Sequence, residues 1–264
     1  MKILVITPCG REEDVIQSHI DSIMTLKGFD VMFVVDEYTN KETSDILDSN
    51  IMNNERIKTL EIENNRGLAG CYIEGYRWFL KSDYDQIIEM DVDSHKVDDL
   101  KTFLKKINEG HKIILGSRSL GKNKSSLKRR MISKIGTRLS NYLLGLNLSD
   151  CTTGFQSFSK DVVGLINFEN FVSKSFLIQT EIKYNALNIP CDEAIRNCKN
   201  LKVMENSCYK FFKFKNGPRF SYIEVPIIYE NSKTSLNLKL VFSSFFEFLT
   251  IVITDKFQKR SKKT

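Results

Sequence analysis

The sequence predicts an α/β protein with a doubly wound, mainly parallel central sheet that is flanked by helices. Short apolar runs rich in β-branched residues alternate with segments whose apolar residues recur at helical spacing, and this alternation is typical of βαβ units. Polar residues follow several of the apolar runs, as expected where strands end at a binding edge. The chain of 264 residues is long enough to bury one sizeable core.

Six apolar runs are predicted to be strands. Residues 2–6 and 31–35 are the clearest, because near-continuous apolar runs suit strands that are covered on both faces. The other predicted strands are residues 58–62, 86–90, 112–115 and 222–229.

Helical spacing marks the segments between these runs. Residues 125–146 and 175–187 are each predicted to form one helix; the first is basic at its start, and the second carries Gln179 and Glu181. The residues that recur at helical spacing elsewhere are Val15, Ile16, His19, Ile20, Ile23 and Met24, then Leu68, Tyr72, Tyr76 and Phe79, then Val97, Leu100, Leu104 and Ile107.

The C-terminal segment is predicted to be an amphipathic helix followed by a basic tail. Residues 238–253 are mostly apolar but contain Lys239 and Glu247, whereas a transmembrane helix needs roughly 20 predominantly apolar residues. We therefore expect this helix to pack on the core or to lie at a membrane surface. Basic residues in the tail 256–264 favour the membrane surface through attraction to anionic headgroups, although a solvated tail also explains them.

The net charge of +6 is concentrated in the tail and in one further cluster. Clustered positive charge favours polyanions, which include nucleic acid, anionic lipid and phosphorylated ligands. Nucleic acid is not expected as a partner, because the basic residues accompany no nucleic-acid-binding motif. The second cluster comprises Lys122, Lys124, Lys128, Arg129, Arg130, Lys134 and Arg138.

The six cysteines are scattered and include no CxxC pair. The first residues lead directly into a short apolar run and do not resemble a secretory signal. We therefore expect reduced thiols in a reducing compartment, which predicts a cytoplasmic protein.

Polar residues lie at the predicted carboxyl ends of four strands. In an open α/β sheet, ligands bind beyond these ends, so the side chains are expected to converge on one site. The residues are Thr7 and Pro8, Asp36 and Glu37, Asp91 and Asp93, and Ser117 and Arg118.

Asp91 and Asp93 are the residues that most directly suggest chemistry. Two carboxylates separated by one residue can hold a hard divalent cation that bridges the oxygens of a diphosphate. The cation would neutralise charge on a departing nucleoside diphosphate. A solvated turn is the alternative interpretation, and the position at a strand end among other polar strand ends favours the site.

Five stretches then form an ordered set along nearly the whole chain. They are Asn65-Arg66-Gly67-Leu68, Glu89-Met90-Asp91-Val92-Asp93, Gly116-Ser117-Arg118, Asp150-Cys151-Thr152-Thr153-Gly154-Phe155 and, more weakly, Glu224-Val225-Pro226-Ile227. On these stretches the chain resembles family-2 glycosyltransferases of the GT-A (nucleotide-diphospho-sugar transferase) fold. The resemblance is strongest to the branch of dolichyl-phosphate and polyprenyl-phosphate mannosyltransferases.

The resemblance implies a donor site for a GDP- or UDP-linked sugar with Mg²⁺ or Mn²⁺. Asp91 and Asp93 resemble the carboxylates that contact the donor and the metal. The residues expected around the nucleotide are Thr7, Pro8, Glu12, Asp36, Arg66, Gly67 and Asp91. The family's usual Asn-Glu after the first strand is replaced here by Gly10-Arg11-Glu12-Glu13.

The resemblance also implies a polyprenyl phosphate acceptor. Arg118, Arg129 and Ser133 resemble the groups that bind its phosphate. Arginine forks suit phosphate oxygens, and a helix that begins near Ser126 adds the attraction of its N-terminal dipole. For Arg129 the alternative is an exposed helix charge.

The expected reaction is inverting transfer of a mannose- or glucose-type hexose to a dolichyl-like polyprenyl phosphate at the cytosolic membrane face. A phosphate oxygen is anionic at neutral pH, so it attacks the anomeric carbon without an obligatory base. A sugar or protein hydroxyl would need a base, and Glu181 is then the candidate, unless it is an exposed helical glutamate. The alternatives are such a hydroxyl acceptor in glycan synthesis, or a non-catalytic nucleotide-sugar-binding module.

The predicted organisation is a glycosyltransferase catalytic domain at residues 1–235, followed by the helix and tail at 236–264. Residues 190–219 are longer than the family's counterpart and are expected to be an insertion. Ser94 and His95 follow the Asp pair one residue earlier than the family's equivalent pair. Whether His95 is a metal ligand or a turn histidine stays open.

Overall fold

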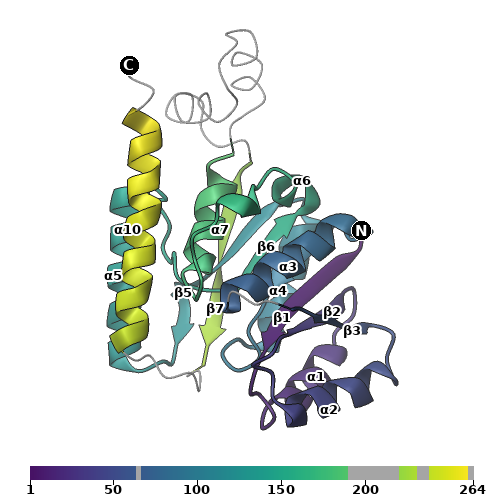
Figure 1. Ribbon diagram of the computed structural model, residues 1–264. Coiled ribbons are helices and arrows are strands. Elements are labelled where there is room, and N and C mark those ends of the chain that lie inside the picture. Colours follow the sequence, from purple (N-terminus) through teal and green to yellow (C-terminus); the bar gives the residue numbers. More distant parts are fainter. Residues whose placement is uncertain (64–66, 190–219, 231–237, 261–264) are drawn as a thin grey trace.

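Seven strands form one sheet in the order β3-β2-β1-β4-β6-β5-β7, with helices on both faces (Figure 1). The structure, a computed structural model, describes residues 1–63, 67–189, 220–230 and 238–260. All strand pairs are parallel except those of β6, which runs antiparallel to β4 and to β5. The predicted α/β class is therefore confirmed, with one reversed strand in the middle of the sheet.

The strands lie close to the predicted runs. β1 pairs with β2 from Leu4 to Cys9, and β5 continues well beyond the predicted residue 115 to pair with β7 as far as Asn123. The bounds are β1 (Ile3–Cys9), β2 (Asp30–Val35), β3 (Ile57–Glu61), β4 (Gln86–Glu89), β5 (Ile113–Asn123), β6 (Gln156–Ser159) and β7 (Tyr222–Tyr229).

The helices also follow the predicted pattern, with additions. The short antiparallel strand β6 and the helix α2 were not predicted. The helices are α1 (Ile16–Met24), α2 (Lys41–Ile51), α3 (Leu68–Lys81), α4 (Leu100–Asn108), α5 (Leu127–Leu144), α6 (Lys160–Val163), α7 (Ile178–Leu187) and α10 (Leu238–Arg260), with 3-10 turns at Val97–Asp99 and Phe168–Asn170.

Successive side chains of β1 point into two different cores, which explains why its apolar run is continuous. Leu4 and Ile6 face a core shared with α3 and α7, whereas Ile3 and Val5 face a second core formed with α1, α2 and α4. Because successive side chains of a strand point to opposite faces, a strand between two cores needs apolar residues at every position.

Helices α5 and α10 stand side by side at one edge of the molecule (Figure 1). Ser126 caps α5 by accepting a hydrogen bond from the Arg129 backbone N–H at 3.4 Å, and Gly145 ends the helix with φ of 68°. The helix α10 continues to Arg260, so residues 254–260, which were expected to belong largely to the tail, extend the helix. Within the described part of the chain, no helix combines the length and the apolar character needed to cross a membrane.

Several expectations fall outside the described residues. Arg66, the predicted insertion at 190–219 and the last residues of the tail, 261–264, belong to this group. Of the cysteines, Cys9, Cys71 and Cys151 are described; all three are buried and unbridged.

Candidate active site

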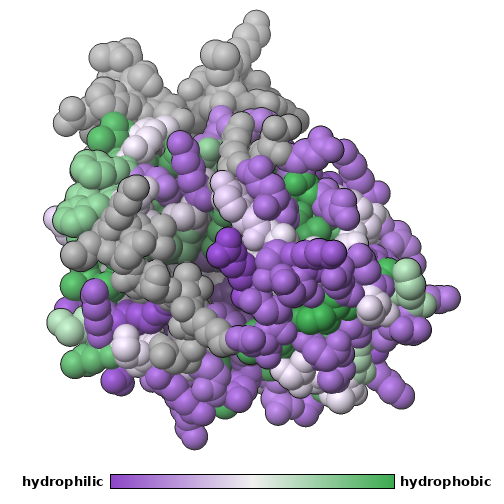
Figure 2. Space-filling view, turned by 60° about the horizontal axis from the view of Figure 1, so that its bottom comes forward, coloured by the Kyte–Doolittle hydropathy of each residue, from purple (hydrophilic) through white to green (hydrophobic). Residues whose placement is uncertain are grey.

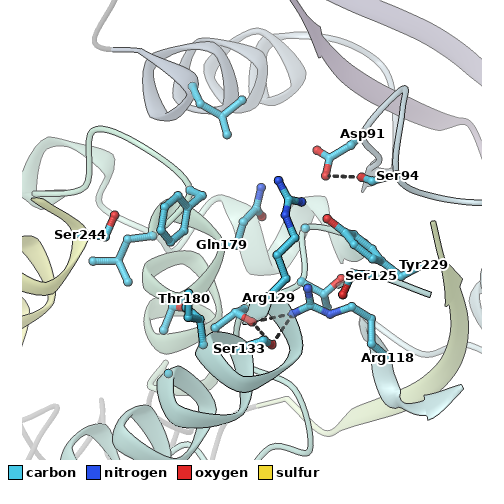
Figure 3. Close-up of a pocket in the computed structure, with 18 of the residues that line it drawn as sticks. Asp91, Ser94, Arg118, Ser125, Arg129, Ser133, Gln179, Thr180, Tyr229 and Ser244 are labelled. Carbon is cyan, nitrogen blue, oxygen red and sulfur yellow. Dashed lines mark hydrogen bonds between the residues drawn. The ribbon is translucent and has the colours of Figure 1, made fainter. Parts of the chain in front are cut away.

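A cavity of about 380 Å³ lies beyond the carboxyl ends of β1 and β4 and is walled by α5, α7 and α10 (Figure 3). It brings together seven of the predicted site residues from four separate parts of the chain. These residues are Pro8, Glu12, Asp91, Asp93, Arg118, Arg129 and Ser133.

Asp91 is oriented at one end of the cavity by two hydroxyl groups. Its Oδ1 accepts a hydrogen bond from Tyr72 OH at 2.9 Å, and its Oδ2 accepts one from Ser94 Oγ at 3.1 Å. Each carboxylate oxygen keeps further lone-pair capacity, so a cation can still bind there. Tyr72 comes from the first turns of α3, so a helix and the turn after β4 each hold one carboxylate oxygen.

Three carboxylates share this end of the cavity. Burial raises the pKa of Glu12, and the nearby negative charges of Asp93 and Asp91 raise it further. A hydrogen bond from the Gly10 backbone N–H lowers this pKa but does not cancel the increase. Like charges gathered in a partly buried site are stabilised by a bound cation. This end is therefore suited to a cation together with the oxygens of a diphosphate.

His95 faces the core and does not line the cavity. Its Nδ1 accepts a hydrogen bond from the Asp91 backbone N–H at 3.0 Å, and its ring lies 5.0 Å from that of Phe155 and 5.5 Å from that of Tyr229. Burial lowers the pKa of His95, so the imidazole is neutral and carries its proton on Nε2. The histidine fixes the backbone of the turn that holds Asp91, and its orientation does not suit a metal ligand.

Arg118 is held in the wall of the cavity by Asp150. Nε and Nη2 of the guanidinium donate to the two carboxylate oxygens at 2.7 and 2.8 Å, which is the bidentate geometry of strong arginine–carboxylate pairs. Nη2 also donates to Ser133 Oγ at 2.9 Å and to Thr152 Oγ1 at 2.5 Å (Figure 3). Burial acts to raise the pKa of Asp150, but the hydrogen bonds and charge of Arg118 hold it below its usual value.

Arg129 projects from the first turn of α5 into the cavity, toward the end that holds Asp91 (Figure 3). It lies next to the N-terminus of an 18-residue helix, where the backbone dipole also attracts anions. The middle of the cavity thus combines Arg118, Arg129 and the hydroxyl groups of Ser133 and Thr152. This combination suits a phosphate group.

A buried polar network lies behind the cavity wall. Gln179, which lines the cavity, accepts a hydrogen bond from Gln156 Nε2 at 2.9 Å, and the same nitrogen donates to Glu89 at 2.9 Å. The wall is tight here, because a Cβ on Gly154 would lie 2.9 Å from the Gln179 amide nitrogen.

Lys183 is fully buried beneath the same wall. Its ammonium group donates to the backbone carbonyl of Thr153 at 2.5 Å and to that of Gln179 at 3.3 Å. Burial lowers the pKa of Lys183 to about 8, although the negative charges of Asp150 and Glu89 act to raise it. A charge buried in this way must be paired or hydrogen-bonded, and the two backbone carbonyls supply the hydrogen bonds here.

The far end of the cavity is apolar. It lies between α5, α7 and α10, and Leu139 and Phe248 face it from two of these helices. The other apolar residues at this end are Ile132, Ile135, Phe176, Leu177, Val241 and Phe245.

Four of the predicted site residues in the described part of the chain do not line this cavity, and three of them, Thr7, Asp36 and Gly67, were expected around the nucleotide. Thr7 is completely buried within β1, and Asp36 accepts hydrogen bonds from the Tyr38 backbone N–H and the Cys71 thiol. Gly67 lies just before α3, and its neighbour Leu68 reaches the cavity instead.

Glu181 is buried and holds a loop. Its two carboxylate oxygens accept hydrogen bonds from the backbone N–H groups of Val172 at 3.0 Å and Ser173 at 2.9 Å. It does not line the cavity, and it is not the exposed glutamate that was the alternative expectation. This position does not favour the role of a general base.

Several residues of the site were not assigned from the sequence. Asp150 and Thr152 lie in a motif that carried the resemblance, so the motif itself was the signal for their importance. Tyr72 was counted only as part of a helical face, and nothing in the sequence indicated that its hydroxyl group contacts Asp91. Tyr229 ends the last strand, and its ring lies against the Arg118 guanidinium at 5.0 Å.

Comparison with known proteins gives relatives along most of the chain. The family model described as glycosyl transferase family 2 matches residues 4–165. An undecaprenyl-phosphate mannosyltransferase of Micrococcus luteus is 28% identical over 193 residues, which are 72% of this chain and 79% of that protein. A polyprenol monophosphomannose synthase of Mycolicibacterium smegmatis is 28% identical over 138 residues, which are 51% of this chain and 52% of that protein.

Solved structures share the fold. Glucosyl-3-phosphoglycerate synthase from Mycobacterium tuberculosis, in complex with Mn²⁺, uridine diphosphate and phosphoglyceric acid, superposes with a TM-score of 0.62 at 11% identity, covering 95% of this chain and 78% of that one. The same enzyme with Mg²⁺ and uridine diphosphate gives a TM-score of 0.60 at 11% identity, covering 94% and 78%. At such low identity these structures support the GT-A fold and nothing finer.

Proposed function

The chain belongs to glycosyl transferase family 2, and we propose that it transfers a sugar from a nucleotide-diphospho-sugar to a polyprenyl phosphate. The relatives named for undecaprenyl-phosphate and polyprenol phosphate chemistry support this choice of acceptor. The proposed sugar is a mannose- or glucose-type hexose, and the proposed donor is GDP- or UDP-linked.

The observation that carries the proposal is the sequence of environments along one cavity. Carboxylates occupy one end, arginines and hydroxyl groups occupy the middle, and apolar side chains occupy the far end. A sugar-nucleotide with its cation, an acceptor phosphate and an isoprenoid chain need these three environments in this order. A hydrophilic glycan acceptor would leave the apolar end without a ligand of matching polarity.

Asp91 and Asp93 are proposed to hold Mg²⁺ or Mn²⁺, with Glu12 nearby. Within the described residues, no three His, Cys, Asp or Glu side chains lie close enough together to form a complete protein site. Donor diphosphate oxygens and water would therefore supply the remaining ligands, as is usual for Mg²⁺. When bound, the cation supplies charge neutralisation for the leaving nucleoside diphosphate.

The acceptor phosphate is proposed to bind between Arg118, Arg129 and Ser133. Its oxygen then forms a bond to the anomeric carbon while the bond from that carbon to the donor diphosphate breaks, with inversion. The phosphate oxygen is already anionic, so no side chain has to remove a proton. The chain's own contribution is to orient the two anions and to stabilise their charges.

A transfer assay with the purified chain tests this function. Labelled GDP- and UDP-sugars are incubated with Mg²⁺ or Mn²⁺ and either a polyprenyl phosphate or the matching polyprenol. We expect an organic-soluble labelled product with the phosphate and none with the alcohol. The proposal is wrong if no donor gives a product, or if the alcohol reacts as well as the phosphate.

The donor end has its own test. Asp93→Ala is expected to abolish the metal-dependent part of nucleotide-sugar binding, measured as the thermal shift with and without Mn²⁺. Binding that is unchanged in this variant, without turnover, would favour a non-catalytic binding module.

A further inference from the structure

A neutral amide, that of Gln179, faces the cavity. Gln179 lies in the first turn of α7, is 4% exposed and lines the cavity wall, and its side chain points into the cavity (Figure 3). The other two glutamines that are buried in the described residues, Gln86 and Gln156, do not line the cavity. Charged groups already serve the proposed cation and phosphate, so a neutral amide suits a neutral part of the substrates.

Hydrogen bonds inside the wall fix the direction of this amide. Gln156 Nε2 donates to Glu89 Oε2 and to Gln179 Oε1, each at 2.9 Å. The other oxygen of Glu89 accepts a hydrogen bond from Tyr76 OH, so both carboxylate oxygens act as acceptors. Because an amide nitrogen carries two hydrogens, Gln156 uses both of them in the wall. The carbonyl oxygen of Gln179 is therefore turned toward Gln156, and its NH₂ group is the end that a ligand can meet.

The NH₂ group of Gln179 lies near the residues that orient Asp91. Burial raises the pKa of Tyr72 well above its usual value, and a hydrogen bond from the Gln179 side chain to the same hydroxyl group acts in the opposite direction. Tyr72 OH in turn donates to Asp91 Oδ1 at 2.9 Å. One N–H of the amide is thus used by Tyr72, and the amide has a second N–H to offer.

Gly154 leaves the space that this amide occupies. A Cβ at position 154 would lie 2.9 Å from Gln179 Nε2 and 3.1 Å from Gln179 Cδ. The φ of Gly154 is not positive, so the backbone itself does not require glycine here. The close approach of the amide is the reason for the glycine, and any side chain at this position would displace the amide.

These contacts place the amide between the two charged parts of the cavity. Tyr72 connects it to Asp91 at the carboxylate end. Gly154 lies two residues after Thr152, whose hydroxyl group accepts a hydrogen bond from Arg118 at 2.5 Å. The transferred sugar must lie between the donor diphosphate and the acceptor phosphate, because its anomeric carbon exchanges one for the other. The amide is therefore placed to meet the sugar.

The surface beyond the carboxyl ends of the parallel strands suits a hydrophilic donor. Figure 2 shows this side of the molecule, which is largely hydrophilic and is hollowed beside a hydrophobic edge at the left. A nucleotide-sugar can approach from this side, and contacts in the cavity wall then decide which sugar is accepted.

We propose that Gln179 is a specificity-determining residue whose amide N–H donates to one hydroxyl oxygen of the transferred sugar, and that Gln156 is the positioning residue that holds the amide in this orientation. The inference rests on the proposed function, since it names a contact within the same site. A sugar that lacks this hydroxyl leaves a buried N–H without an acceptor, which is costly. Gln179 therefore selects hexoses that carry the hydroxyl over the matching deoxy sugar.

Deoxy donors test the contact. GDP-mannose or UDP-glucose, whichever reacts in the transfer assay, is compared with its 2-, 3-, 4- and 6-deoxy forms. For one of these forms we expect kcat/KM of the unchanged chain to fall by a factor of about ten or more. Gln179→Met should use that form and its parent equally to within about twofold. If Gln179→Met is slowed by the same factor with every donor, the residue is structural and the proposal is wrong.

Displacement of the amide gives a second test. Gly154→Ala retains Gln179 but moves its amide, so it should lose the same discrimination against the deoxy donor. Gly75→Ala is the control, because its Cβ would lie 3.3 Å from Ile6 Cδ1 in the core of the sheet, away from the cavity. Equilibrium binding of the donors with Mn²⁺ gives the same comparison for a variant that turns over too slowly. Full discrimination in Gly154→Ala, or an equal loss in Gly75→Ala, overturns the proposal.

Gln156→Met tests the positioning role. This change frees the Gln179 amide to rotate, so discrimination against the deoxy donor should fall, and Gln156→Met/Gln179→Met should show no further fall. Gln86→Met is the matched control, since Gln86 Nε2 donates to Ser157 Oγ at 2.8 Å in the same core. Both single variants should lose stability in urea. Discrimination that is unchanged in Gln156→Met, or reduced as much in Gln86→Met, contradicts the positioning role.

The unchanged chain separates this inference from the proposed function. No product with any donor contradicts the function itself. Product from every deoxy donor at the rate of its parent contradicts the contact of Gln179 with the sugar and leaves the transferase function intact.

Discussion

Arg118 and Arg129 lie in the same cavity but have different surroundings. Arg118 forms a bidentate pair with Asp150 and also holds Ser133 and Thr152, so most of its donors are occupied within the protein. Arg129 extends into the cavity toward Asp91. We therefore expect Arg118 to shape the phosphate site and Arg129 to respond most directly to the phosphate charge.

Arg129→Ala is expected to lower kcat/KM for the polyprenyl phosphate up to about 100-fold, because a hydrogen bond to a charged group contributes about 1.5–3 kcal/mol. The KM of the nucleotide-sugar should change little. Glu181→Gln is the comparison: it should retain most transfer activity and lose about 1–2 kcal/mol of folding stability, because Glu181 anchors a backbone loop. The opposite pattern, with transfer abolished only in Glu181→Gln, would indicate a hydroxyl acceptor and a general base.

Lys183→Met is expected to raise the KM of the acceptor several-fold while the KM of the donor is preserved. The change removes the donor to the Thr153 carbonyl and the positive charge next to Asp150, and both support the wall that holds Arg118. Lys160→Met is the matched control, since Lys160 also donates to a backbone carbonyl, that of Ser82, away from the cavity. Both variants should lose stability by urea unfolding, and an equal effect on acceptor KM would refute the positional role.

His19 is expected to make the fold sensitive to acid. Burial, with a smaller effect from His95, lowers the pKa of His19 from 6.5 to about 4. The unfolded chain therefore takes up a proton below pH 6.5 that the folded chain refuses, and stability falls as the pH decreases. Between pH 7 and pH 5 this costs about 2 kcal/mol.

Urea unfolding at the two pH values measures this effect. His19→Leu should lose about 2 kcal/mol less than the unchanged chain on acidification, whatever its stability at pH 7. His111→Gln, at a partly exposed histidine, is the control and should behave as the unchanged chain does. An identical pH dependence in His19→Leu would show that the buried imidazole does not carry the effect.

At this scale, the sequence allowed the residues of the site to be chosen but not their pairings. Asp91, Asp93 and Arg118 could be found because they follow apolar strands and stand in an ordered set of motifs. The contact of Tyr72 with Asp91 and the pair of Arg118 with Asp150 depend on how distant segments meet. No local pattern reports such contacts, because they are fixed only when the sheet is assembled.

At the scale of elements, strands with two apolar faces were predictable and β6 was not. β6 is a buried strand of only four residues, Gln156–Ser159, and three of them are polar. Gln156 Nε2 donates to Glu89 and Gln179, and Ser157 Oγ accepts from Gln86, so two of the three polar side chains have partners inside the core, while Gln156 Oε1 and Ser159 Oγ have none. A method based on apolar runs misses a strand whose burial is made possible by hydrogen bonds.

The helix α2 was missed for a related reason. Only Thr43 and Leu47 of its eleven residues are buried, so the helical period of apolar residues is faint. Its start is marked instead by Asn40, whose side chain accepts a hydrogen bond from the Thr43 backbone N–H at 3.2 Å. The sequence feature that indicates α2 is therefore its N-cap residue Asn40 and not a periodic apolar face.

The start of α3 offers a test of backbone geometry. Gly67 has φ of 69°, and a Cβ at this position would lie 2.7 Å from the Lys174 carbonyl oxygen. Gly67→Ala should therefore lose about 2–3 kcal/mol in urea unfolding, from the left-handed backbone and the collision together. Gly110→Ala isolates the first cause, because Gly110 has φ of 88° and no atom within 4 Å of its Cβ position. A loss in Gly67→Ala no greater than that in Gly110→Ala would show that the loop at Lys174 moves away freely.

At the scale of the whole molecule, the cavity joins parts that no single element contains. The segments that follow β1 and β4 supply the carboxylates, α5 supplies Arg129 and Ser133, and α10 closes the apolar end. The sequence predicted the sheet and the helices, and it also predicted that 238–253 is amphipathic. It could not show that α10 lies along α5 and completes the cavity, because this contact joins segments about a hundred residues apart.

The apolar end predicts a dependence on the length of the acceptor chain. Each buried CH₂ group contributes about 0.8 kcal/mol, so an additional isoprene unit that fits inside should lower the acceptor KM at least tenfold. The gain should stop once the chain reaches the mouth between Ile135 and Phe245. Leu139→Asn should weaken the dependence, and a KM that is independent of chain length for soluble acceptors would contradict the assignment of this end.

The reversed strand β6 also sets an order for assembly during synthesis. β4, which precedes Asp91, and β5, which carries Arg118, are not neighbours in the sheet, since β6 lies between them. A chain emerging from the ribosome can pair β1 to β4 early, because these four strands pair with one another in parallel and all precede β6 in the sequence. The two halves of the cavity can meet only after residues 156–159 have been made and inserted, and α10 then closes the apolar end last. A nascent chain is therefore expected to bind both substrates only after α10 has been made.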